Sequence, residues 1–170
     1  MRCFRLLLTV CLAVALAGCA GYQVGPTGGQ IAGEKSVQIV PFANRTTEAR
    51  LSDAVTFALR KEVQRDGTFR LAARDPGDIV VSGTLTNYSR REISLVTSDV
   101  ATAQDYNVSL TAHVTARERQ SDKVILDRAV TSYTLVRVTQ DLPSSERQAL
   151  PLLATDLARR VTALLADGAW

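Results

Sequence analysis

The sequence predicts an α+β fold, a two-layer sandwich in which two helices pack on one face of a small mixed, mostly antiparallel sheet. Between positions 106 and 116, apolar and polar residues alternate strictly, which predicts a half-buried strand. Two other segments, near 49–65 and from about 150 onward, carry apolar residues at spacings of three and four, the pattern of amphipathic helices. The order strand, helix, several strands, helix favours two helices that share one face of a sheet.

The domain is predicted to begin with a strand and a helix. Residues 36–42 form a short apolar and β-branched run that Pro41 ends, which predicts a strand. Polar residues 44–47 form a turn that offers helix-capping side chains. After the helix, Gly67 suits a left-handed C-terminal cap. The apolar stripe of this helix comprises Leu51, Ala54, Val55, Ala58, Leu59 and Val63.

A set of strands follows the first helix. The first part is predicted to contain a short strand at 69–72, a turn at 75–77 and a strand from 78 to about 88. A polar connection at about 90–104 then leads to a strand over 106–116, a turn at 120–123 and a strand over about 124–138. The last two strands form a hairpin. Its inward positions are Tyr106, Val108, Leu110, Ala112, Val114 and Ala116, whereas Asn107, Ser109, Thr111, His113 and Thr115 face outward.

The C-terminal segment predicts a second helix that contains a proline. Residues 143–146 offer an N-cap candidate beside an acidic first turn. Because Pro151 would cost about 3 kcal/mol in a helix interior, the helix either starts near Leu150 or is kinked there, and we favour a kink or a short first segment. The apolar repeat is Leu150, Leu153, Leu157, Val161, Leu164 and Leu165.

The N-terminus is typical of a bacterial lipoprotein precursor. Arg2 and Arg5 precede an uncharged run over 6–16, which is shorter than the roughly 20 residues of a membrane-spanning helix. Leu-Ala-Gly-Cys at 16–19 then forms a lipobox, so we expect cleavage before Cys19 and acylation of that residue with S-diacylglycerol and N-palmitoyl groups. Ordinary signal cleavage after Ala-Leu-Ala at 15–17 is the alternative. Ala20, rather than Asp, after the cysteine favours export to the outer membrane, where the domain would face the periplasm.

These signals divide the chain into a signal peptide (1–18), a lipidated N-terminus with a Gly-rich tether (19–35) and one domain (36–170). Removal of the signal takes two of the 20 Lys and Arg residues, which leaves 18 against 17 acidic residues and a net charge of +1. A nearly neutral domain has no general electrostatic attraction to nucleic acid, so we exclude nucleic-acid binding.

We find no catalytic centre, metal site or cofactor motif. Cys19 is the one cysteine left after cleavage, and His113, the sole histidine, lies on the polar face of a predicted strand, where an ordinary exposed residue is expected. The segment GGQIAGEKS resembles a phosphate-binding loop, but Glu34 occupies the lysine position and a strand follows instead of a helix. The chain is therefore expected to be a binding or assembly module and not an enzyme.

Two features are candidate binding surfaces. The first is the row Ser109, Thr111, His113 and Thr115, which is either a solvated sheet face or a docking surface. The second is the pair Arg90 and Arg91, since guanidinium groups suit bidentate contacts to phosphate, although such a pair is more often simply solvated.

Several strings together resemble the family of LPS-assembly lipoproteins called LptE. The resemblance covers nearly all the mature chain, with one departure at Ala49-Arg50, where a Pro-Gly-like pair is expected before the helix. The strings are CAGY at 19–22, SVQIVPFANRTTEARLSDAVTFALRKEVQRDGTFRL at 36–71, DIVVSG at 78–83, the run 105–114, AL at 149–150 and DLARRV at 156–161.

The resemblance implies a partner and a ligand. Members of this family act as plug and assembly partner inside the outer-membrane β-barrel LptD, in a one-to-one complex, and bind lipopolysaccharide on its way to the outer leaflet. On this reading Arg90, Arg91 and Lys123 are candidate contacts for lipid A phosphates.

A different class remains open as the alternative. The string SVQIVPFANRT is also similar to the opening of periplasmic lipoproteins related to the curli secretion channel and to activators of cell-wall synthases. A pore former should expose long amphipathic hairpins, and the predicted strands are short, which disfavours that option.

Overall fold

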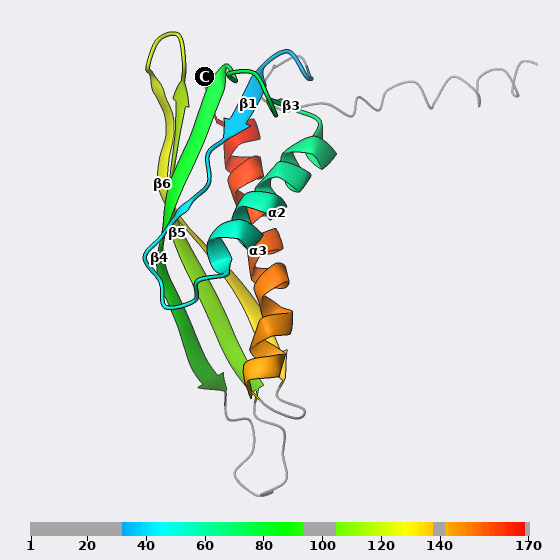
Figure 1. Cartoon of the computed structure of the whole chain (residues 1–170), viewed down its shortest axis with the longest axis vertical. Helices are drawn as coiled ribbons and strands as arrows, with labels where there is room; N and C mark the ends of the chain where they lie inside the picture. The colour runs from blue at the N-terminus through cyan, green and yellow to red at the C-terminus, as the bar shows by residue number, and fades with distance from the viewer. Residues whose placement is uncertain (1–31, 94–104, 138–141, 169–170) are drawn as a thin grey trace, which may run out of the picture.

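The computed structural model describes residues 32–93, 105–137 and 142–168 (Figure 1). The predicted signal peptide, Cys19, most of the tether and most of the 90–104 connection lie outside these ranges. The elements are β1 (Ser36–Ile39), β2 (Ala43–Asn44), α2 (Leu51–Asp66), β3 (Arg70–Leu71), β4 (Ile79–Ile93), β5 (Asp105–Glu118), β6 (Val124–Arg137) and α3 (Leu142–Ala166).

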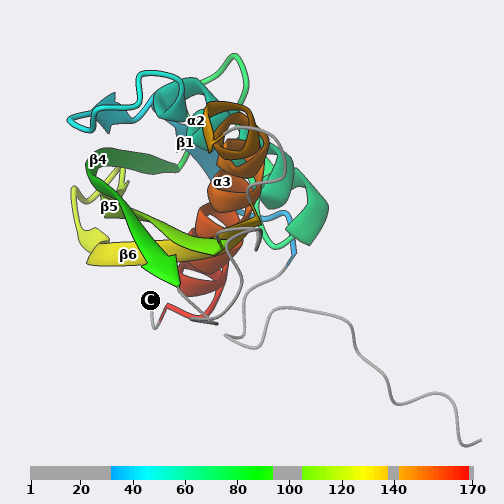
Figure 2. The ribbon, with the colours of Figure 1, turned by 90° about the horizontal axis from the view of Figure 1, so that it is seen from below.

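The six strands form one mixed sheet in the order β3-β1-β4-β5-β6, and β2 also pairs with β4. The short strands β1, β2 and β3 make parallel pairs, whereas β4, β5 and β6 are antiparallel neighbours. Both helices lie on the same face of this sheet (Figures 1 and 2). The predicted two-layer α+β architecture is therefore confirmed.

The core lies between this face and the two helices. The inward residues of β5 from Val108 to Ala116 are all fully buried, as their alternation predicts. They meet buried leucines and valines of both helices, of which Leu51, Val55, Leu153, Leu157 and Val161 are also completely inaccessible. Apolar burial of this kind is the dominant stabilising contribution to such a domain.

Two of the three long strands, β4 and β5, are longer than predicted, whereas β6 matches its predicted range. β4 extends to Ile93 rather than about 88, because it passes a bulge between Leu85 and Asn87 and pairs with β5 over its full length. At about 3.3 Å per residue, these strands of 14 and 15 residues span almost 50 Å. The predicted shortness of the strands is thus wrong, and it no longer argues against a pore-forming protein.

The start of α2 is built differently from the prediction. Arg50 is the N-cap residue and makes no side-chain capping bond. Asn44 instead stabilises the preceding turn, where its Oδ1 accepts from the Thr46 amide at 2.9 Å and its Nδ2 donates to the Glu48 carbonyl at 2.8 Å. At the other end, Gly67 has the predicted left-handed conformation, with φ of 76°, and donates to the Val63 carbonyl.

Helix α3 runs without interruption from Leu142 through Pro151 to Ala166, so a start near Leu150 is wrong. Pro151 itself points outward, while Ala149, Leu150 and Leu153 are buried against the sheet. Tertiary packing of this face can offset the local cost of a proline, because most helical stability in proteins comes from such packing.

A close approach joins the N-terminal segment to the sheet at Gly83 of β4. A Cβ placed on Gly83 would overlap the ring of Phe42, which is 2% exposed. The Phe42 backbone is also fastened to α2, because the Ser52 hydroxyl donates to its carbonyl at 2.6 Å. The glycine therefore lets the segment between β1 and α2 lie flat across β4.

Candidate binding surface

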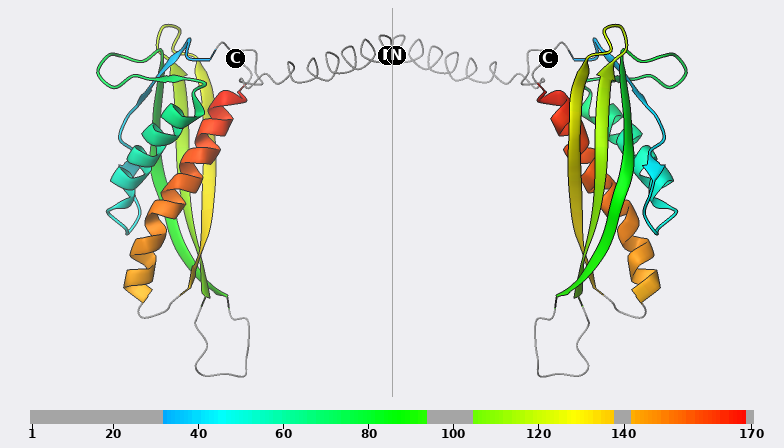
Figure 3. Two further views of the ribbon diagram at one scale, coloured as in Figure 1. Left: turned by 90° about the vertical axis from the view of Figure 1, so that its right-hand side faces the viewer. Right: turned by 90° about the vertical axis from the view of Figure 1, so that its left-hand side faces the viewer.

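The face of β4, β5 and β6 that points away from the helices is uncovered among the described residues, and we call it the open face (Figure 3). It includes the predicted row Ser109, Thr111, His113 and Thr115, whose outward direction is confirmed. By strand register the open face comprises Ser82, Thr84, Asn87, Ser89 and Arg91 of β4, Asn107, Ser109, Thr111, His113 and Thr115 of β5, and Asp127, Ala129, Thr131, Tyr133, Leu135 and Arg137 of β6.

Hydroxyl groups bond to one another across the strands of the open face. Ser89 and Ser109 lie 2.8 Å apart through their hydroxyl oxygens, and Thr111 and Thr131 lie 3.0 Å apart. The buried Oδ1 of Asn107 has no hydrogen-bond partner among the described residues. The centre of the face is thus neutral and largely satisfied internally, with one acceptor still available.

Charged groups on the open face are arranged mainly as pairs between β5 and β6. Arg137 donates to both carboxylate oxygens of Asp105, at 3.0 and 3.3 Å. These hydrogen bonds hold the pKa of Asp105 below its usual value and raise the pKa of Arg137. Farther along the hairpin, His113 Nε2 lies 3.3 Å from Asp127 Oδ1. Such exposed pairs contribute little to stability.

The predicted pair Arg90 and Arg91 is divided between the two faces of the sheet. Arg90 lies on the helix side and donates to Glu146 Oε1 of α3 at 2.8 Å. Tyr88 points to the same side, where burial, followed by the Glu146 carboxylate, raises the pKa of its phenol to about 12. Arg91 lies on the open face opposite Asn107 and makes no ion pair within residues 32–93, 105–137 and 142–168. The two guanidinium groups therefore cannot chelate one phosphate together in this arrangement.

Lys123 lies at the other end of the sheet, in the turn between β5 and β6, where its carbonyl accepts from the Glu118 amide. Eleven residues of β5 separate Glu118 from Asn107, the partner of Arg91. At about 3.3 Å per residue this is roughly 36 Å. The three predicted phosphate contacts therefore do not form one site. Of the three, only Arg91 is exposed on the open face and has no ion-pair partner among the described residues.

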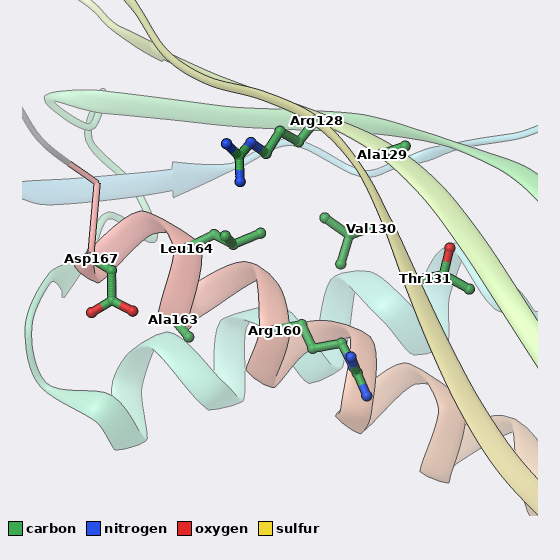
Figure 4. A pocket seen from close by; sticks show the side chains of 8 residues that line it. All are labelled: Arg128, Ala129, Val130, Thr131, Arg160, Ala163, Leu164 and Asp167. Atoms are coloured by element: carbon green, nitrogen blue, oxygen red, sulfur yellow. The ribbon is translucent and has the colours of Figure 1, made fainter.

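The sequence reading missed a groove of about 430 Å³ between β6 and the last turns of α3 (Figure 4). Its walls are Arg128, Ala129, Val130 and Thr131 of β6 and Arg160, Ala163, Leu164 and Asp167 of α3. One feature of the sequence could have indicated the groove. Arg128 occupies a helix-facing position between Leu126 and Val130, where the alternation of the strand predicts an apolar residue.

No group of three or more His, Cys, Asp or Glu side chains suited to a metal ion occurs within residues 32–93, 105–137 and 142–168. In the same ranges, neither helix is long and apolar enough to cross a membrane.

The sequence model of one protein family, described as LptE: Lipopolysaccharide-assembly, matches residues 34–165. This match spans almost the whole described domain. The chain belongs to the LptE family. The family match confirms the resemblance seen in the sequence. It also supports a general role for the protein in lipopolysaccharide assembly. No curated protein matches the sequence.

Solved structures resemble the fold of this LptE-family domain at low identity. A hypothetical protein from Chlamydia trachomatis is 13% identical, with a TM-score of 0.56, over 80% of this chain and 96% of that chain. A protein from Xanthomonas campestris is 10% identical, with a TM-score of 0.55, over 84% of this chain and 90% of that chain. These likenesses support the two-layer fold alone.

Proposed function

We propose that this protein is an outer-membrane lipoprotein that plugs and assists assembly of the LptD barrel and binds lipopolysaccharide during its insertion into the outer leaflet. The observation that carries the proposal is the LptE-family match over residues 34–165. The role requires no chemical step, so we regard the protein as a non-enzymatic assembly factor without a cofactor.

The open face is the proposed docking surface for the barrel. The interior of a large outer-membrane barrel is polar, because lipid-facing and lumen-facing residues alternate along its strands. A long face of hydroxyl and amide side chains with few unpaired charges is compatible with such a wall. Away from Arg91, this face can exchange its water contacts for hydrogen bonds to the wall without burying an unpaired charge.

Recovery of the partner tests this proposal directly. Tagged protein extracted from detergent-solubilised membranes is expected to bring down LptD at one-to-one stoichiometry. Recovery of a cell-wall synthase, or of a ring of identical subunits, would support the alternative class instead. The LptE-family match favours the first outcome.

Membrane attachment is proposed to occur through Cys19, whose acyl chains would hold the domain on the periplasmic side of the outer membrane. Mass spectrometry of the native protein should show a lipid-modified N-terminal cysteine. An unmodified N-terminus, or cleavage after Ala17, would contradict the anchor without affecting the fold.

Arg91 is the phosphate contact that we favour among the three candidates. Arg91→Glu is expected to weaken lipopolysaccharide binding about tenfold, since charge-assisted contacts of arginine to phosphate are among the stronger hydrogen bonds. Arg90→Gln is the comparison, because Arg90 is already engaged by Glu146. Equal affinity of wild type and Arg91→Glu, measured with purified lipopolysaccharide, would remove Arg91 as a contact.

A further inference from the structure

Strand β6 forms one edge of the sheet and pairs only with β5 among the described strands. The Tyr133 amide points away from β5, because it donates to Asp156 Oδ2 of α3 at 3.4 Å. In an antiparallel ladder every second residue has the same backbone direction. The N–H and C=O groups of Ala129, Thr131 and Leu135 therefore also point outward from the edge.

Helix α3 runs alongside this edge and forms the second wall of a groove. Asp156, Arg160 and Leu164 follow one another at intervals of four residues, so they lie on one ridge of the helix. Asp156 reaches β6 at Tyr133, and Arg160 and Leu164 line the groove beside Thr131 and Arg128. A second hollow of about 390 Å³ shares Arg128, Leu164 and Asp167 and continues the groove toward Ile125.

The groove combines backbone hydrogen-bonding groups with mixed walls, in which Val130, Ala163 and Leu164 are apolar and Arg128, Arg160 and Asp167 are charged. Figure 4 shows Arg128 and Val130 on the α3 side of β6, whereas Ala129 and Thr131 point the other way. Arg160 is paired with Asp156 at 2.8 Å, but Arg128 has no ion-pair partner in the described part of the chain. An exposed edge strand beside a helix is the geometry in which an extended peptide adds to a sheet as a further strand.

We propose that the β6–α3 groove binds an extended segment of a partner protein, which adds to β6 as a strand and places a carboxylate beside Arg128. The inference rests on the proposed function, in which that partner is the LptD barrel. Charge complementarity favours an acidic segment, because Arg128 has no ion-pair partner among the described residues. Arg160 is paired with Asp156 and Asp167 also lines the groove, so Arg128 is the cation that the segment would neutralise.

A second copy of this chain is a poorer occupant of the groove. On the helix-facing side, β6 presents Leu126, Arg128, Val130, Ser132, Thr134 and Val136, so another β6 would bring a second arginine and no acid. An inward-pointing charge on an edge strand is a known device against such edge-to-edge pairing. Apolar surface at the lower end of the edge, Leu135 at 68% and Leu152 at 59% exposure, remains for a different partner to cover.

Hydrogen–deuterium exchange of the free protein and of its LptD complex tests the inference. The outward amides of Ala129 and Thr131 should exchange at least about tenfold more slowly in the complex, because a new strand would accept their hydrogen bonds. The amides of Val130 and Ser132 serve as internal references, since their alternation directs them toward β5.

Two substitutions accompany the exchange measurement. Arg128→Glu should weaken the complex at least about tenfold, whereas Arg159→Glu, exposed on α3 outside the groove lining, should stay within about twofold. Ala129→Pro removes an outward donor but no bond to β5, so it should also weaken binding. Thermal unfolding of each variant verifies that it folds.

The outcomes separate the two proposals. A complex that forms without new protection at Ala129 and Thr131, or that tolerates Arg128→Glu, would overturn the groove inference and leave the proposed function intact. Protection of these amides in a homodimer would replace the partner by a second copy and overturn it as well. Absence of any LptD complex with the wild-type protein would overturn both.

Discussion

The two faces of the sheet differ although the same strands supply them. The helix-facing side of β5 is fully buried and apolar from Val108 to Ala116, and α2 and α3 cover it. The open face carries hydroxyl, amide and charged side chains that no described element covers. The alternating sequence of these strands thus places the hydrophobic core on one side of the sheet. On the other side it leaves a polar surface to which another molecule can bind. The comparison predicts that stability depends on the first face and partner binding on the second.

Leu157→Ala should give the largest loss of stability. Leu157 of α3 is completely buried, so its truncation removes apolar contacts and leaves a cavity, at a cost of about 2–5 kcal/mol in the free energy of unfolding. His113→Ala on the open face is the control and should change this free energy by no more than about 0.5 kcal/mol. Urea unfolding of both variants measures the two losses of stability. Equal losses would contradict the claim that stability depends on the helix-facing side and not on the open face.

Gly83→Ala should have the next largest effect. The new methyl group would overlap the buried Phe42 ring, and overpacking of this kind costs about 1–3 kcal/mol. Gly33→Ala does not serve as a control, because its positive φ adds strain of its own. Instead, the double variant Gly83→Ala with Phe42→Leu should recover part of the lost stability if the clash is the cause. No recovery in thermal unfolding would argue against this cause.

The smallest effect concerns the exposed Asp105–Arg137 pair. Its hydrogen bonds lower the pKa of Asp105 in the folded state, so its contribution to stability is present above about pH 4 and is lost as the pH falls through the folded pKa. Arg137→Gln should raise the pKa of Asp105 toward its ordinary value. NMR titration of the carboxylate measures this shift, and an unchanged pKa would rule out Arg137 as its cause.

The fold was predictable because each main element has a regular pattern. Alternation in β5 and spacings of three and four in α2 and α3 identified most of the buried positions, and Gly67 marked the end of α2. The two-residue strand β2 was not predictable, because its pairing with Thr84 and Leu85 depends on the path between β1 and α2. The extension of β4 to Ile93 likewise depends on pairing with β5, since residues 89–92 are all polar.

The candidate site was predictable only in part. The outward row from Ser109 to Thr115 followed from alternation alone. Adjacent arginines in a strand point to opposite faces, so the division of Arg90 from Arg91 follows once β4 is known to include them. The β6–α3 groove could not be predicted, because it depends on where α3 lies relative to the edge of the sheet.

The most direct test of the account is the affinity of LptD for a variant with a charge at the centre of the open face. Thr111→Arg should leave the domain folded, yet weaken the one-to-one complex at least about tenfold, because the added guanidinium would be buried against the barrel wall without a partner. Gln64→Arg, on the exposed side of α2, is the matched control and should bind as wild type does. Wild-type affinity of a folded Thr111→Arg variant would contradict the open face as the docking surface.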